Sequence, residues 1–91
     1  MMNRYVIERD VPGVGRNDQA GYCNIARVSN AALGKLAPRV QWEHSYVTEN
    51  KTFCIYLADS VEAVREHARL SGFPANIVTL VNTLIDPTTE R

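Results

Sequence analysis

The sequence lacks an excess of charge of one sign and lacks any long apolar run. Its 91 residues carry ten basic and ten acidic side chains, so the formal net charge at pH 7 is zero. This balance argues against a protein that binds nucleic acid or a membrane surface through charge. No apolar run approaches the roughly 18–20 residues that span a bilayer, and no signal-peptide core follows Met1. We therefore expect a cytoplasmic protein with neither a nucleic-acid nor a membrane partner.

Cysteine motifs and catalytic signatures are also missing. The two cysteines, Cys23 and Cys54, lie far apart without a CxxC spacing, so a zinc knuckle is not indicated and a reducing compartment would keep both as thiols. There is no GxSxG, P-loop, HExxH or dinucleotide motif, and Gly13-Val14-Gly15 after a strand is typical of a turn. The sequence thus favours a protein without catalytic residues, although enzymatic activity stays open.

What is present is enough for one small domain spanning residues 1–91. Apolar residues make up 45% of the chain, which excludes the disordered class. A chain of this length buries only roughly 60–65% of its unfolded surface and is marginally stable alone. Association with a second copy would therefore add stability.

Hydrophobic periodicity and turn signals predict four strands and two helices. We expect strands at residues 4–9, 40–49, 52–58 and 77–85, and helices at residues 17–37 and 59–72, with a short helical turn at 73–76. Asn50-Lys51 should form the hairpin turn, because Asn tolerates positive φ. In the second helix Asp59 and Glu62 are expected to form a capping box.

The order β-α-β-β-α-β predicts an α+β fold of the ferredoxin-like sandwich type. This fold is a four-stranded antiparallel sheet in the order 4-1-3-2, with both helices on one face. The other face is left bare, so it must be polar, bind a ligand or pack against another copy.

Alternation along the predicted hairpin separates its side chains into two faces. The more apolar face is expected to point toward the helices or a dimer partner, and it contains Trp42, His44, Tyr46, Thr48, Phe53, Ile55 and Leu57. The opposite face, which contains Glu43, Cys54 and Tyr56, is polar enough to be wet. A thiol in mid-strand such as Cys54 is nevertheless more often a small buried hydrophobe than a nucleophile.

His44 is the residue type best suited to hold a metal ion. Neutral imidazole is a ligand for nickel, copper or zinc, and Glu43, Tyr46 and Glu66 could add oxygen donors. The alternative is a histidine satisfied by one hydrogen bond.

His67 is expected at the flank of the second helix, whose inner face would contain Val61, Val64 and Ala68. That helix should cross strands four and one, whereas His44 lies on edge strand two. The two histidines therefore either serve separate sites or meet across a dimer.

Five segments together resemble a known family: WEHSYVT, KTFCIY, REHA, GFPA and IDPTT, which begin at Trp42, Lys51, Arg65, Gly72 and Ile85. They are similar to the small bacterial nickel-binding ferredoxin-like proteins, formerly catalogued as a domain of unknown function and typified by a streptomycete nickel-binding protein. The resemblance implies a ferredoxin-like homodimer that binds Ni(II), with no catalytic activity attached. His44 and His67 match the histidines of the hairpin and helix motifs. Glu43, Tyr46, Cys54 and Glu66 are further candidate ligands.

The leading hypothesis is non-catalytic binding of nickel, or of another divalent transition metal, by a cytoplasmic homodimer formed through the open sheet face. Two alternatives come from other classes. One is a small-ligand enzyme in which His44 or Tyr46 acts as acid–base group beside an enclosed cleft. The other is a structural or regulatory dimer module in which metal capture is incidental.

Overall fold

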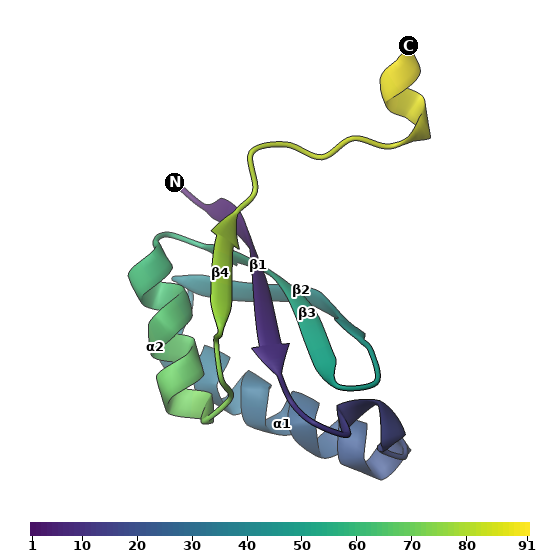
Figure 1. Ribbon diagram of the computed structural model, residues 1–91. Helices are drawn as coiled ribbons and strands as arrows, with labels where there is room; N and C mark the ends of the chain where they lie inside the picture. Colours follow the sequence, from purple (N-terminus) through teal and green to yellow (C-terminus); the bar gives the residue numbers. More distant parts are fainter.

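The computed structural model describes residues 1–91 as one four-stranded sheet with two helices (Figure 1). The strands are β1 (Asn3–Asp10), β2 (Val40–Val47), β3 (Lys51–Ala58) and β4 (Ile77–Leu80), and the helices are α1 (Gln19–Leu36) and α2 (Val61–Ser71). Two short 3-10 helices, η1 (Val14–Arg16) and η2 (Pro87–Glu90), complete the chain. The sheet order is β2-β3-β1-β4 and every neighbouring pair is antiparallel. The predicted ferredoxin-like α+β fold is confirmed.

Helix α1 lies where the sequence predicts it. The side chain of Asp18 accepts a hydrogen bond from the Gly21 amide and caps the first turn. The helix ends at Leu36, just before Pro38, which cannot continue a helix. It places Ser29 and Ala32 in the buried layer against the sheet.

Helix α2 differs from the prediction in its cap and in its buried face. Its N-cap is Ser60, which accepts a hydrogen bond from the Ala63 amide, so the expected capping box does not form. The residues buried against the sheet are Ala63, Val64 and His67, whereas Val61 is 38% exposed. The small Ala63 side chain is fully buried and faces the sheet, which turns Val61 outward. The helix stops at Gly72, at φ 80°, as predicted.

The β2–β3 hairpin turns at Glu49-Asn50 rather than at Asn50-Lys51. Val47 pairs with Thr52, a shift of two residues from the expected register, which preserves the alternation of faces. Asn50 does not adopt positive φ. It bonds instead to the loop after β1, because its carbonyl accepts from the Val11 amide and its side chain from the Gly13 amide. The predicted turn at Gly13-Val14-Gly15 thus packs on the hairpin tip.

The two hairpin faces are the reverse of what their composition suggests. Thr52, Cys54 and Tyr56 are buried under the helices, so the face expected to be wet is part of the core. The face with His44, Tyr46, Phe53, Ile55 and Leu57 points away from the helices, and we call it the open face. A β-bulge between Trp42 and His44 moves Trp42 off this face and into the core layer.

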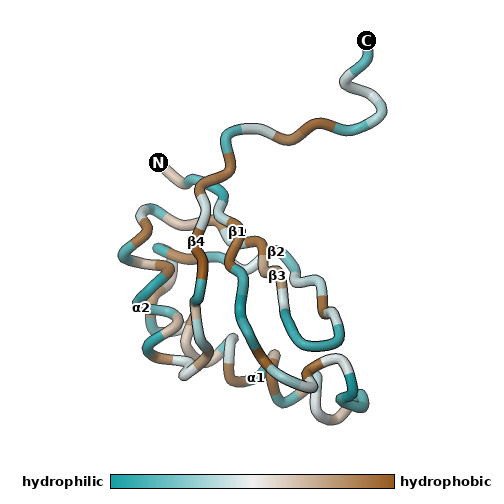
Figure 2. The backbone as a smooth tube through the Cα atoms, viewed as in Figure 1, coloured by the Kyte–Doolittle hydropathy of each residue, from teal (hydrophilic) through white to brown (hydrophobic).

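The last strand is shorter than predicted, and no helical turn precedes it. The amide of Val81 donates to the Arg4 carbonyl, and β1 begins at Asn3, so no strand is left to pair with residues beyond 81. Residues 81–91 run away from the sheet to η2 (Figure 1). They carry Leu84 and Ile85, which are 65% and 75% exposed, in a hydrophobic stretch visible in Figure 2. Neither helix has the length and apolar character of a membrane span.

Candidate functional site

His44 and Tyr46 lie side by side on the open face of edge strand β2. Their ring centroids are 5.1 Å apart and their planes are nearly perpendicular, at 80°. Both side chains are exposed, and His44 stands beside Ile55 of β3 in the sheet register. The pair therefore offers an imidazole and a phenol to a ligand that approaches this face.

Glu43 is next to this pair, but its carboxylate is already held. The Arg4 guanidinium donates to Oε1 at 2.6 Å and to Oε2 at 3.2 Å, in a two-point ion pair between β1 and β2. The hydrogen bond from Arg4 lowers the pKa of the Glu43 carboxyl. Glu43 stays ionised there. It could bind a metal ion only if its oxygens were shared between the metal and Arg4, or if the ion pair with Arg4 broke.

Glu66 lies on the outer side of α2 and pairs with Arg69 one turn later. The second guanidinium nitrogen of Arg69 donates to Glu66 Oε2 at 2.8 Å, and this pairing lowers the pKa of the carboxyl. His67, the next residue, points in the opposite direction into the protein. Glu66 and His67 therefore do not form a common site, although they are adjacent in sequence.

His67 is fully buried, not at the helix flank as the sequence suggests. Its Nε2 lies 3.2 Å from Ser29 Oγ and 3.3 Å from the Ser29 carbonyl, and Ser29 Oγ lies 3.4 Å from the Tyr56 hydroxyl. Its Nδ1 has no hydrogen-bond partner. Burial lowers the pKa of His67, and the nearby charge of Arg9 lowers it further, against the opposing effect of its hydrogen bond to the Ser29 carbonyl.

Cys54 is buried in the core on the same side of the sheet as His67. Its thiol donates weakly to Thr52 Oγ1 at 3.5 Å, as expected for a small buried hydrophobe. The six candidate ligands thus occupy three places. His44, Glu43 and Tyr46 lie on the open face, Cys54 and His67 lie in the interior, and Glu66 lies on the outer surface of α2. The chain brings no three histidine, cysteine, aspartate or glutamate side chains into one metal-binding group. A single chain alone does not supply a closed metal site.

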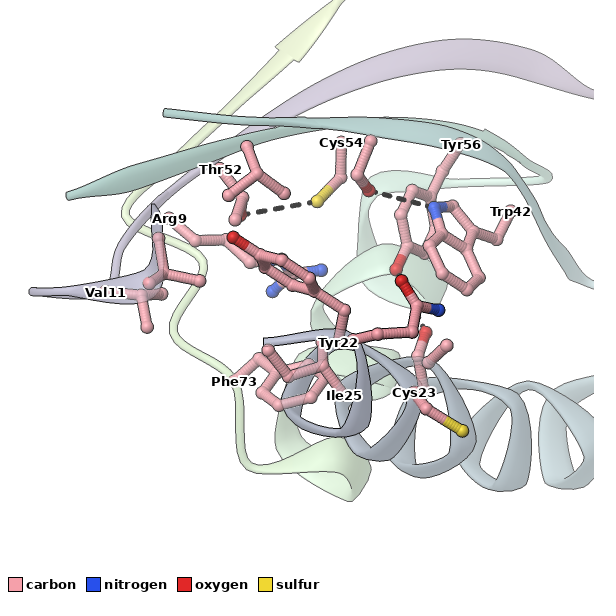
Figure 3. A pocket seen from close by; sticks show the side chains of 16 residues that line it. Arg9, Val11, Tyr22, Cys23, Ile25, Trp42, Thr52, Cys54, Tyr56 and Phe73 are labelled. Atoms are coloured by element: carbon pink, nitrogen blue, oxygen red, sulfur yellow. Dashed lines mark hydrogen bonds between the residues drawn. The ribbon is translucent and has the colours of Figure 1, made fainter. Parts of the chain in front are cut away.

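A cavity of about 380 Å³ lies between the sheet and α1 (Figure 3). Most of its lining residues are hydrophobic, with Tyr22 and Ile25 from α1 and Trp42 and Tyr56 from the sheet. It is on the helix side of the sheet, opposite the face that carries His44. The enzyme hypothesis requires an enclosed cleft beside His44, and this cavity does not provide it.

Arg9 lines this cavity and was missed as a functional candidate. It is only 3% exposed, and it alternates with Tyr5 and Ile7 on the buried side of β1. That alternation was available in the sequence and places a cation in the core. A charged residue near the end of a strand is normally exposed to solvent, so residue type alone predicts an exposed Arg9.

Comparison with known proteins identifies the family of this chain. Residues 5–81 match the family model described as "Nickel responsive protein SCO4226-like". The chain belongs to this family. The match includes every candidate ligand named above and ends one residue after β4, so the IDPTT segment lies beyond it. The predicted family resemblance is confirmed.

A solved structure supports the fold of this SCO4226-like chain. The crystal structure of SCO4226 from Streptomyces coelicolor A3(2) superposes with a TM-score of 0.76 and covers 90% of this chain and 99% of that one. The two sequences are 14% identical, so this likeness is evidence for the fold alone. No curated protein sequence matches the chain.

Proposed function

We propose that this SCO4226-like chain binds divalent nickel as a non-catalytic, cytoplasmic homodimer, and that the metal is held at the open face around His44. The observation that carries the proposal is the exposed His44–Tyr46 pair, with ring centroids 5.1 Å apart. Imidazole nitrogen suits nickel, and neither ring is engaged by another side chain through a hydrogen bond. The family description, nickel responsive, names the metal.

A second copy would complete the site. In a two-fold dimer the same patch of each protomer meets its copy, so two His44–Tyr46 pairs could face one another. The open face supplies half-buried apolar side chains for this contact, Val6, Phe53, Ile55 and Leu57, which alternate with the residues buried under the helices. Uncovered apolar surface of this kind marks interaction sites.

The other candidates, His67, Cys54 and Glu66, are not metal ligands in this proposal. His67 and Cys54 lie on the helix side of the sheet, and the cavity there contains the Arg9 cation, which repels a divalent metal ion. Glu66 is paired with Arg69 on the outer surface of α2. The proposed ligands are therefore His44 and Tyr46, with Glu43 available if Arg4 releases it.

Calorimetric titration with nickel of protein stripped of metal by a chelator tests this proposal. The natural chain should give a saturable heat, and His44→Ala should lose it. His67→Gln serves as the matched control, because it removes the other histidine and should leave the binding isotherm unchanged. Saturable binding that survives His44→Ala, or that disappears only in His67→Gln, would overturn the assignment.

A further inference from the structure

The Arg9 guanidinium is a buried cation without an anionic partner. Its Nη1 donates to the Pro74 carbonyl at 2.7 Å, while its Nη2 is buried without a hydrogen-bond partner. The ion pairs of the chain all involve other residues. Arginine stays charged at any ordinary pH, and a buried charge is costly unless it is paired.

Aromatic rings hold this cation in place but do not neutralise it. The Arg9 guanidinium carbon lies 5.8 Å from the centre of the Tyr56 ring and 5.9 Å from that of Phe73. Figure 3 shows the Arg9 side chain extending from β1 and passing behind the ring of Tyr22, another lining residue. The guanidinium is thus fixed in position in a residue that lines the cavity, and its buried Nη2 has no hydrogen-bond partner.

The rest of the cavity is suited to an apolar body. Val11, Tyr22, Ile25 and Trp42 contribute hydrophobic surface, and 380 Å³ is near the lower end of the size range of small-molecule sites. Arg9 is the only charged side chain on the lining, and the neutral polar groups there belong to Gln19, Tyr22, Ser29, Ser45, Thr52 and Tyr56. Burial raises the pKa of the Tyr56 hydroxyl, so it keeps its proton and remains a donor.

We propose that this cavity binds a small organic acid whose carboxylate pairs with Arg9 and whose apolar body packs against Tyr22 and Trp42. A guanidinium and a carboxylate match in shape and charge, which gives the strongest common hydrogen bonds in proteins. A phosphate carries up to two negative charges, whereas the lining offers the single positive charge of Arg9, so a carboxylate matches the site better. The site lies across the sheet from His44 and is independent of the proposed nickel binding.

Fluorescence titration of metal-free protein provides the test, because Trp42 is the only tryptophan and lines the cavity. With a chelator present, phenylacetate should change the Trp42 emission saturably. Phenylacetamide, which has nearly the same shape but no charge, should bind at least about tenfold more weakly, as expected for loss of a charge-assisted hydrogen bond. Equal affinity for the two compounds, no saturable change with phenylacetate, or tighter binding of inorganic phosphate would overturn the proposal.

Substitution of Arg9 gives a second, independent result. Arg9→Met keeps a long apolar side chain and should weaken phenylacetate binding at least about tenfold. Arg4→Met, on the same strand but the opposite face, should leave it unchanged. The melting temperature of Arg9→Met should be at least that of the natural chain, since an unpaired buried charge has been removed. Undiminished phenylacetate binding by folded Arg9→Met contradicts the proposal, and if this variant fails to fold, the comparison of acid with amide decides.

Discussion

At the scale of single residues, the buried His67 side chain has a hydrogen-bond partner from the protein in place of water. Its Nε2 depends on Ser29 of α1, and Ser29 also reaches the Tyr56 hydroxyl on β3. These hydrogen bonds therefore connect both helices to the sheet through polar atoms. The sequence of α2 alone could not place His67 in the core, because the partner that makes its burial tolerable belongs to another element.

Acid should destabilise the fold through His67. Its pKa in the folded protein is lowered from the ordinary value of 6.5, so below about pH 6.5 the unfolded chain binds a proton that the folded chain does not. The free energy of unfolding should be level above that pH and fall below it, by at most about 1.4 kcal/mol per pH unit for one proton. Urea denaturation at fixed protein concentration, at about pH 7.5 and about pH 5.5, measures this.

The matched variants for this experiment are His67→Gln and His44→Gln. His67→Gln should flatten the pH dependence in that range, whereas His44→Gln, at an exposed site, should retain it. A natural chain whose stability does not change between the two pH values would show that His67 is not held neutral by burial.

At the scale of elements, the approach of η1 to the hairpin tip depends on Gly15. Its amide donates to the Glu49 carbonyl, and a β-carbon at this position would stand 2.6 Å from the Thr48 carbonyl oxygen and 2.8 Å from the Glu49 α-carbon. These neighbours are backbone atoms that cannot move alone. The contact joins the β1–α1 loop to the β2–β3 turn.

Gly15→Ala should therefore destabilise the protein, by about 1–3 kcal/mol if the loop must shift. Gly34→Ala is the control: it lies within α1 with nothing within 4 Å of the added carbon, and should stabilise by up to about 1 kcal/mol. Thermal unfolding of both variants gives the comparison. Equal melting temperatures for Gly15→Ala and the natural chain would show that the loop does not rest on the turn as described.

The elements themselves were largely predictable, whereas their contacts were not. The order of strands and helices and the approximate ends of α1 and α2 follow from local chemistry that each segment carries. The hairpin register could not be predicted in this way. Asn50 accepts a hydrogen bond from the loop after β1 and does not adopt positive φ. The face with Cys54 and Tyr56 was predicted to be wet but is buried, because residue composition alone favours the more apolar face for the core. Of the two options for the other face, contact with the helices is wrong and contact with a dimer partner stays a prediction.

Of the candidate site, the sequence predicted that His44 and Tyr46 share one face of a strand. It placed Glu43 on the opposite face, whereas the bulge between Trp42 and His44 lets Glu43 reach Arg4. It could not show that Arg4 holds Glu43, since β1 and β2 are joined through β3 and their side chains meet only across the sheet. It also could not show that the bulge after Trp42 separates Trp42 from His44. Such contacts depend on tertiary register, which no local pattern fixes.

At the scale of the whole molecule, the open face should determine the oligomeric state. Its central residues, Ile55 and Phe53 of β3, are apolar and half-buried within one chain. Ile55→Glu would bury a charge in the proposed interface, so this variant should sediment as a 10.2 kDa monomer while the natural chain sediments at twice that mass. Val28→Glu, at an exposed position on the outer side of α1, is the control and should remain dimeric. A natural chain that is monomeric at all concentrations would remove the proposed route to a shared metal site.

The most direct test of nickel binding at the open face is anomalous scattering at the nickel edge from crystals grown with the metal. The predicted result is a single strong peak at the dimer interface, within ligand distance of His44 from both protomers. A peak beside His67 or Cys54 in the interior, or no peak on the open face, would contradict it.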